Sequence, residues 1–199
     1  MSSEYTADLS LCERFQEFRD RNQWIFYVPR TGNEGEEALA YGLLFEILRK
    51  KTALMMISPA DPQRYVPVYQ DALKYRLPTI RHSRLFTSKV PKNNRVYFIE
   101  DPEPVRDFYA CADLVLPGGT LDSSSPVKPD LRTPILAGKP IVVGPHRQDA
   151  LVQEAVRAGV VRTGEDVESL AEAVRELLSD PEKAAQLASS AREWLASRA

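Results

Sequence analysis

Two loops of small and polar residues carry the side chains best suited to bind a phosphate or a sugar. The first is Pro117-Gly118-Gly119-Thr120, and the second is Gly144-Pro145-His146. Paired glycines permit positive φ angles and let a ligand approach the backbone closely. The imidazole of His146 can hydrogen-bond a phosphate or a sugar hydroxyl. Its alternative role is structural, because the same ring could simply cap the helix that follows.

The apolar runs 113–116 and 140–143 precede these loops and predict their position in the fold. Both runs are too short and too rich in β-branched residues for helices, so we interpret them as buried parallel strands. Ligands of open α/β sheets bind outside the carboxyl ends of the strands. The two loops therefore belong to one candidate site.

Two further loops contribute candidate residues to the same edge. Thr31 and Gly32 follow the predicted strand 24–28 and precede a helix whose free amides favour an anion. Arg64 follows the second predicted strand and could bind a phosphate at this edge only if its side chain reaches inward. We interpret Glu36 and Glu37 as residues that merely complement the dipole of their own helix.

The pattern of alternating strands and helices predicts the fold class. Residues 24–199 form an α/β, three-layer α/β/α Rossmann-like domain with a mostly parallel sheet of about six strands. Residues 1–23 form an N-terminal helix and linker, with Leu11, Phe15 and Phe18 on one apolar stripe. The predicted strands are 24–28, 52–57, 78–80, 95–99, 113–116, 140–143 and 160–161.

The amino-acid composition excludes several classes of function. The 199 residues include 26 basic and 28 acidic side chains, so the net charge of -2 gives no basis for a nucleic-acid partner. No apolar run approaches the ~20 residues of a spanning helix, and no signal peptide is present, so we expect a cytoplasmic protein. Cys12 and Cys111 lack CxxC spacing, and we expect them to be reduced, buried fillers. Two histidines and no clustered ligands predict no metal site and no cofactor.

Four segments carry a resemblance to a known family: ADLVLPGGT (112–120), AGKPIVVGPH (137–146), AGVVR (158–162) and EDVESLAEAVRELLSDPE (165–182). Together they resemble the C-terminal donor-binding half of GT-B glycosyltransferases, most closely the Kdo (3-deoxy-D-manno-octulosonic acid) transferases. The resemblance is specific from about Asn94 onward and looser from Trp24.

The resemblance implies half of a GT-B fold that binds a nucleotide-sugar, with CMP-Kdo and lipopolysaccharide synthesis as the candidate donor and pathway. In that family the catalytic acid and the acceptor groove belong to the other half, so we assign no catalytic residue here. The resemblance further implies an acceptor-domain protein partner, inactivity without it, and peripheral association with the inner membrane through it.

The chain departs from the family pattern at three places. Ala60 and Asp61 stand where the family has an Arg-His pair, and Thr133 stands where it has the glutamate that holds the ribose. Thr133 can form one hydrogen bond to a sugar hydroxyl but offers no bidentate carboxylate. Prolines in the loop 100–104 remove amide donors. These departures favour an alternative function, a non-catalytic nucleotide-binding, sugar-binding or protein-interaction module with a degenerate glycosyltransferase fold.

Overall fold

The computed structural model describes residues 5–85, 89–100 and 105–198. Its centre is a five-stranded parallel sheet in the order β3-β4-β2-β1-β5. The five strands are β1 (Trp24–Thr31), β2 (Ala53–Pro59), β3 (Thr79–Arg81), β4 (Val96–Phe98) and β5 (Leu114–Val115). Two more parallel strands, β6 (Val142–Val143) and β7 (Arg162–Thr163), extend the sheet through a bridge between Val115 and Ile141. The predicted parallel, layered α/β fold is confirmed.

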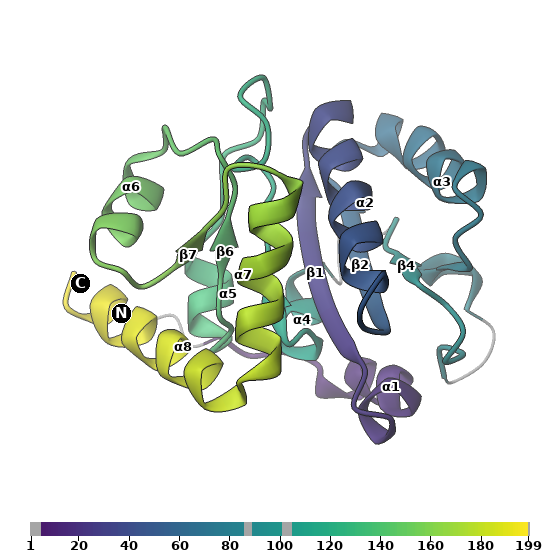
Figure 1. Cartoon of the computed structure of the whole chain (residues 1–199), viewed down its shortest axis with the longest axis horizontal. Helices are drawn as coiled ribbons and strands as arrows, with labels where there is room; N and C mark the ends of the chain where they lie inside the picture. The colour runs from purple at the N-terminus through teal and green to yellow at the C-terminus, as the bar shows by residue number, and fades with distance from the viewer. Residues whose placement is uncertain (1–4, 86–88, 101–104, 199) are drawn as a thin grey trace.

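Helices cover both faces of the sheet (Figure 1). One face carries α2 (Glu34–Leu48), η2 (Pro62–Arg64), α3 (Tyr65–Lys74) and α7 (Val167–Ser179). The other carries η1 (Leu9–Phe15), α1 (Gln16–Asp20), η3 (His82–Arg84), α4 (Val105–Phe108) and η4 (Tyr109–Cys111). Around β6 and β7 lie α5 (Arg132–Leu136), α6 (Ala150–Arg157) and α8 (Pro181–Ala196). In Figure 1, α2 and α7 lie on the near side of β1, with α4 and α5 behind the sheet.

The central strands are buried on both faces, which explains their continuous apolar sequences. In β1, Phe26 and Val28 pack on the side of α2, whereas Ile25 and Tyr27 pack on the side of η1 and α4. All four side chains are fully buried. The alternation follows from the two-residue period of a strand.

The strand order creates a topological switch point between β1 and β5. The chain leaves β1 to build β2, β4 and β3 on one side, and then returns to place β5 on the other side. Loops from neighbouring strands turn in opposite directions at such a point, which opens a crevice at the carboxyl ends of the strands. The predicted site loops after β1 and β5 flank this crevice.

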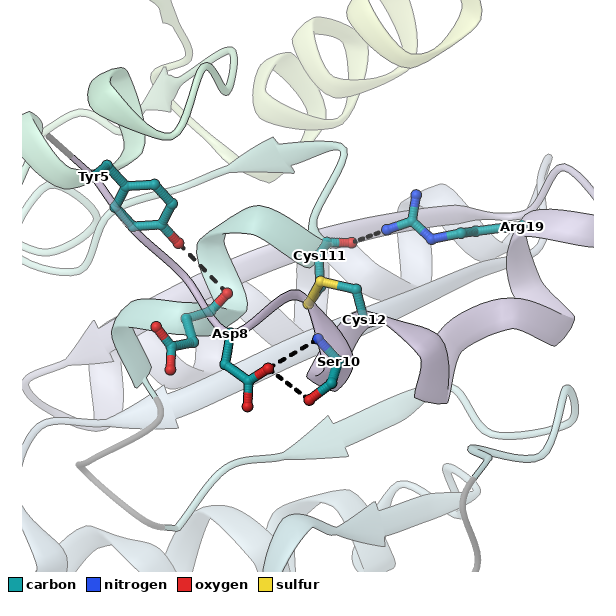
Figure 2. Close-up of a disulfide and its surroundings, with 7 residues drawn as sticks. Tyr5, Asp8, Ser10, Cys12, Arg19 and Cys111 are labelled. Atoms are coloured by element: carbon teal, nitrogen blue, oxygen red, sulfur yellow. Dashed lines mark hydrogen bonds between the residues drawn. A yellow bond between two sulfur atoms is a disulfide. The ribbon is translucent and has the colours of Figure 1, made fainter.

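The prediction that the two cysteines are reduced is wrong. Cys12 and Cys111 form a disulfide, although 99 positions separate them in the chain. The fold brings η1 against η4, so that the two Cα atoms lie 4.9 Å apart (Figure 2). Spacing along the sequence carries no trace of this tertiary contact.

The last predicted strand is displaced by two residues. The backbone nitrogen of Val160 donates to the carbonyl of Ala155 and closes the end of α6. Pairing therefore begins later, where the nitrogen of Arg162 donates to the carbonyl of Ile141. Among the helices that the structure describes, none has the length and apolar character needed to cross a membrane.

Candidate functional site

The loop after β5 packs directly on the end of β1. The nitrogen of Gly118 donates to the carbonyl of Pro29 over 2.9 Å. A Cβ atom on Gly118 would lie 2.1 Å from the carbonyl oxygen of Arg30, which is far inside van der Waals contact. Only glycine fits here, so Gly118 serves the contact between the two loops rather than a ligand.

The carboxylate of Glu36 ties the loops of this edge together. It is fully buried and accepts hydrogen bonds from the nitrogens of Gly32 (2.8 Å), Gly119 (2.6 Å) and Leu121 (3.1 Å) and from the hydroxyl of Ser125 (3.0 Å). The interpretation of Glu36 as a residue that only complements the dipole of its helix is therefore wrong. A carboxylate with several donors is strongly held, because charge-assisted hydrogen bonds are the stronger ones.

Asn33 sets the position of this carboxylate. Its side-chain oxygen accepts from the nitrogen of Glu36 at 3.0 Å and caps α2. Its amide nitrogen donates to Asp122 and Ser124 in the loop after β5. The hydrogen bonds from Ser124 hold the pKa of Asp122 below its ordinary value. The side chains of Asn33 and Glu36, at the start of α2, thus hold the loop 122–125 in place.

Thr120 links the loop after β5 to the loop after β6. Its buried hydroxyl donates to the carbonyl of Pro117 and accepts from the nitrogen of Gly144 at 3.2 Å. Its carbonyl accepts from the nitrogen of His146 at 2.9 Å. These bonds leave the Thr120 hydroxyl facing the protein, and they hold the partly buried His146 at the sheet edge beside Asp122.

Arg64 reaches inward and pairs with Glu37. Its guanidinium forms an ion pair with the Glu37 carboxylate, which is 1% exposed and also accepts from the hydroxyl of Thr31. Burial raises the pKa of Glu37, and the hydrogen bond from Arg64 opposes that shift. The predicted phosphate fork is consequently engaged inside the protein.

Thr133 lies in the first turn of α5 and is bonded to Asp130. Its nitrogen and its hydroxyl both donate to that carboxylate, at 3.0 and 2.6 Å. Asp61 is likewise used locally, since it accepts from the nitrogen of Gln63 and begins η2. Of the predicted loop 100–104, only Glu100 belongs to the described residues, and it pairs with Arg81.

A cavity of about 480 Å³ opens beside these loops, between the end of β1 and the start of α6. Three cations line it, Arg30, Lys128 and Arg132, together with the carboxylates of Asp130 and Asp149. Both carboxylates also accept hydrogen bonds locally, since Asp149 caps α6 and Asp130 accepts from α5. Three cations against two carboxylates leave a surplus positive charge, which suits an anion.

Arg30 takes an unusual backbone conformation at the mouth of this cavity. Its φ angle is 57°, in the left-handed region that costs a non-glycine residue about 1–2 kcal/mol. The strand register between β1 and β2 shifts at the same place, between Pro29 and Thr31. This irregularity turns the Arg30 side chain out of the strand repeat and toward the cavity that it lines.

The structure gathers most sequence-predicted site residues at one edge. Those in the connected loops are Thr31, Gly32, Gly118, Gly119, Thr120 and His146. Thr133 borders the cavity through Asp130, and Arg64 contacts the loops only through Glu37. Sequence reasoning missed the three lining cations. Arg30 had a visible signal, since it directly follows an apolar strand within PRTG.

Comparison with known proteins decides the fold. No family model and no curated protein matches the chain. The C-terminal CMP-Kdo binding domain of WaaA from Acinetobacter baumannii superposes with a TM-score of 0.80, at 20% identity over 93% of this chain and 95% of that one. The chain therefore has the three-layer fold of one half of a GT-B structure. This half accounts for nearly the whole of the chain.

Two other solved structures share this fold at lower similarity. The C-terminal domain of LpcC from Francisella tularensis, a group 1 glycosyl transferase, has a TM-score of 0.61 at 11% identity, over 98% of this chain and 95% of that one. Anabaena Alr3699/HepE in complex with UDP-glucose has a TM-score of 0.64 at 17% identity. The match spans 97% of this chain but only 49% of HepE.

Proposed function

We propose that this chain is the donor-binding half of a glycosyltransferase and that it binds a nucleotide-sugar at the carboxyl ends of β1, β5 and β6. The observation that carries the proposal is the positively charged cavity beside the switch point of a GT-B donor-half fold. The similar domains support it, because one is described as CMP-Kdo binding and another was solved with UDP-glucose.

The cations of the cavity take the phosphate in this proposal. Arg30 and Arg132 offer planar guanidinium groups that can bind a phosphate through two hydrogen bonds, and Lys128 adds a flexible ammonium. His146 and Thr133 contact the sugar or the nucleoside in this proposal.

CMP-Kdo is the donor that we propose first, because the domain with a TM-score of 0.80 is described as binding it. Transfer of the sugar in lipopolysaccharide synthesis would require an acceptor-domain partner, which also supplies any peripheral contact with the inner membrane. A cytoplasmic location belongs to the same proposal. The disulfide weighs against it, since most disulfides form in oxidising compartments.

A non-catalytic binding or interaction module is the second candidate function. This candidate is favoured because polar side chains at this edge of the sheet already bind one another instead of being available to a ligand. Arg64 is paired with Glu37, and Thr133 is paired with Asp130. A donor would have to compete with these internal bonds.

Calorimetric titration with CMP, UDP, CMP-Kdo and UDP-glucose tests the proposal. We expect saturable binding to one nucleotide series and an affinity loss of about tenfold in Arg30→Gln, which is the loss of one charge-assisted contact. Arg49→Gln is the matched control, because the Arg49 side chain is 72% exposed and follows the last residue of α2, and Arg49 does not line the cavity. Absence of binding at millimolar nucleotide would reject the donor role.

A second assay separates the two candidate functions. The chain is mixed with the separately expressed acceptor half of a Kdo transferase, the donor and a lipid acceptor, and product is followed by mass spectrometry. Product that depends on both halves supports an active donor half. Donor binding without product in this mixture favours the non-catalytic module.

A further inference from the structure

A second cavity, of about 410 Å³, lies at the opposite end of the parallel strands. Trp24, the first residue of β1, lines it together with Asp113, which directly precedes β5. The first turns of α8 and the end of α7 close its other side through Ala184 and Leu177. At about 3.3 Å per residue, the eight residues of β1 separate this cavity from the donor edge by about 23 Å.

The charged side chains that line this cavity form no ion pairs with one another in the described part of the chain. Lys139 and Arg19 face it with Asp113 as the only carboxylate among the residues that line it. Asp113 accepts from the nitrogen of Ile25 at 2.8 Å, and Arg19 donates to the carbonyl of Cys111 at 3.1 Å (Figure 2). No ion pair joins Lys139 to Asp113 in the described part of the chain. One positive charge is left over.

Partial burial makes this surplus positive charge unfavourable. Desolvation lowers the pKa of Lys139. The negative charge of Asp113 opposes this shift, and the positive charge of Arg19 adds to it. Burial likewise raises the pKa of Asp113. A partly buried ammonium group that lacks a direct anionic partner is stabilised by an anion that enters its site.

Two uncharged polar side chains, Asn22 and Gln23, also line the cavity. The remaining wall is apolar and includes the ring of Trp24, Leu177 and Leu178, which suits a carbon chain.

We propose that this cavity binds a small organic anion, with its carboxylate or phosphate between Lys139 and Arg19 and its carbon chain against the apolar wall. The site lies at the amino ends of the strands, so it is independent of the donor site and of its proposed function.

The fluorescence of Trp24 reports on the cavity directly. The protein contains only two tryptophans, so a Trp194→Phe background leaves Trp24 as the single emitter. The probes are gluconate, its neutral counterpart sorbitol, and inorganic phosphate. We expect a saturable change with gluconate, a weaker one with phosphate, and none with sorbitol. A linear response to gluconate, or an equal response to sorbitol, would overturn the proposal.

Substitutions locate the anion within the cavity. In the same background, Lys139→Met should weaken gluconate binding by about tenfold or more, which is the loss of one buried charge contact. Lys74→Met is the control and should bind as the background does, because Lys74 is exposed on α3. If Lys139→Met does not fold by circular dichroism, Arg19→Gln takes its place, since Arg19 is exposed. Unchanged affinity in the folded variant would contradict the assignment.

Discussion

The carboxylate of Glu36 lies 2.6 Å from the nitrogen of Gly119, although 83 positions separate the two residues. The same side chain also holds the nitrogens of Gly32 and Leu121. An anion of the protein itself therefore sits among the loop amides at the edge proposed for the donor. The loops are arranged before a ligand arrives, which lowers the entropy that binding must overcome.

Glu36→Gln should destabilise the protein by about 3 kcal/mol. The substitution places an NH₂ group against backbone donors and removes a buried, charge-assisted acceptor. Urea unfolding measures the loss. Glu34→Gln, an exposed position in the same helical turn, is the control and should stay within about 0.5 kcal/mol of wild type. Equal stability of the two variants would show that the carboxylate does not hold the loops.

Gly118→Ala should destabilise the fold by more than about 2 kcal/mol, because its methyl group would overlap the carbonyl of Arg30. Gly42→Ala provides the contrast. A methyl group there meets only a Val167 methyl at 3.3 Å, and alanine favours the helix α2. Thermal unfolding of both variants checks the pair. Tolerance of Gly118→Ala would mean that the loop after β5 does not press on β1 as described.

Arg64→Ala should cost about 2 kcal/mol at neutral pH, because it strands the buried Glu37 carboxylate. Burial already raises the folded pKa of Glu37, and loss of the guanidinium should raise it further. When the pKa of a carboxyl group is higher in the folded state than in the unfolded state, its contribution to the free energy of unfolding is greatest below the ordinary pKa of 4.5. This contribution is lost as the pH rises through the pKa of the folded state. The deficit of the variant should therefore shrink as pH falls from 7 toward 4. Urea unfolding across this range measures it, and a deficit that grows on acidification would contradict the pairing.

Reduction of the disulfide between Cys12 and Cys111 should lower stability by about 2–4 kcal/mol, since the bond closes a long loop. Urea unfolding with and without dithiothreitol measures the difference. Cys12→Ser should unfold identically in both conditions and near the reduced wild type. Two titratable thiols in the unreduced, denatured protein would show that the bond does not form.

Apolar periodicity was sufficient to predict the layered parallel fold. Strands such as β1 and β2 are buried on both faces, so their sequences carry a strong local signal. The displaced β7 shows the limit, because Val160 and Val161 are buried and β-branched yet do not pair as predicted. The backbone nitrogen of Val160 is bonded to the end of α6, and composition does not encode this contact.

The candidate site was predictable only in part. Glycine loops and strand ends identified the edge that holds Gly119 and His146. Sequence alone could not show that Glu36 turns toward amides 83 positions away, or that Cys12 meets Cys111. Both outcomes depend on long-range packing, whereas sequence patterns report short-range structure.

The most direct test of the donor site is amide NMR of the isotope-labelled protein during titration with CMP. The account predicts saturable shifts concentrated at the carboxyl edge, with Arg30, Leu131 and His146 among the largest. Trp24 and Lys139, at the far end of the strands, should move little. No shifts at millimolar CMP, or shifts confined to the far cavity, would contradict the claim that this edge binds a nucleotide.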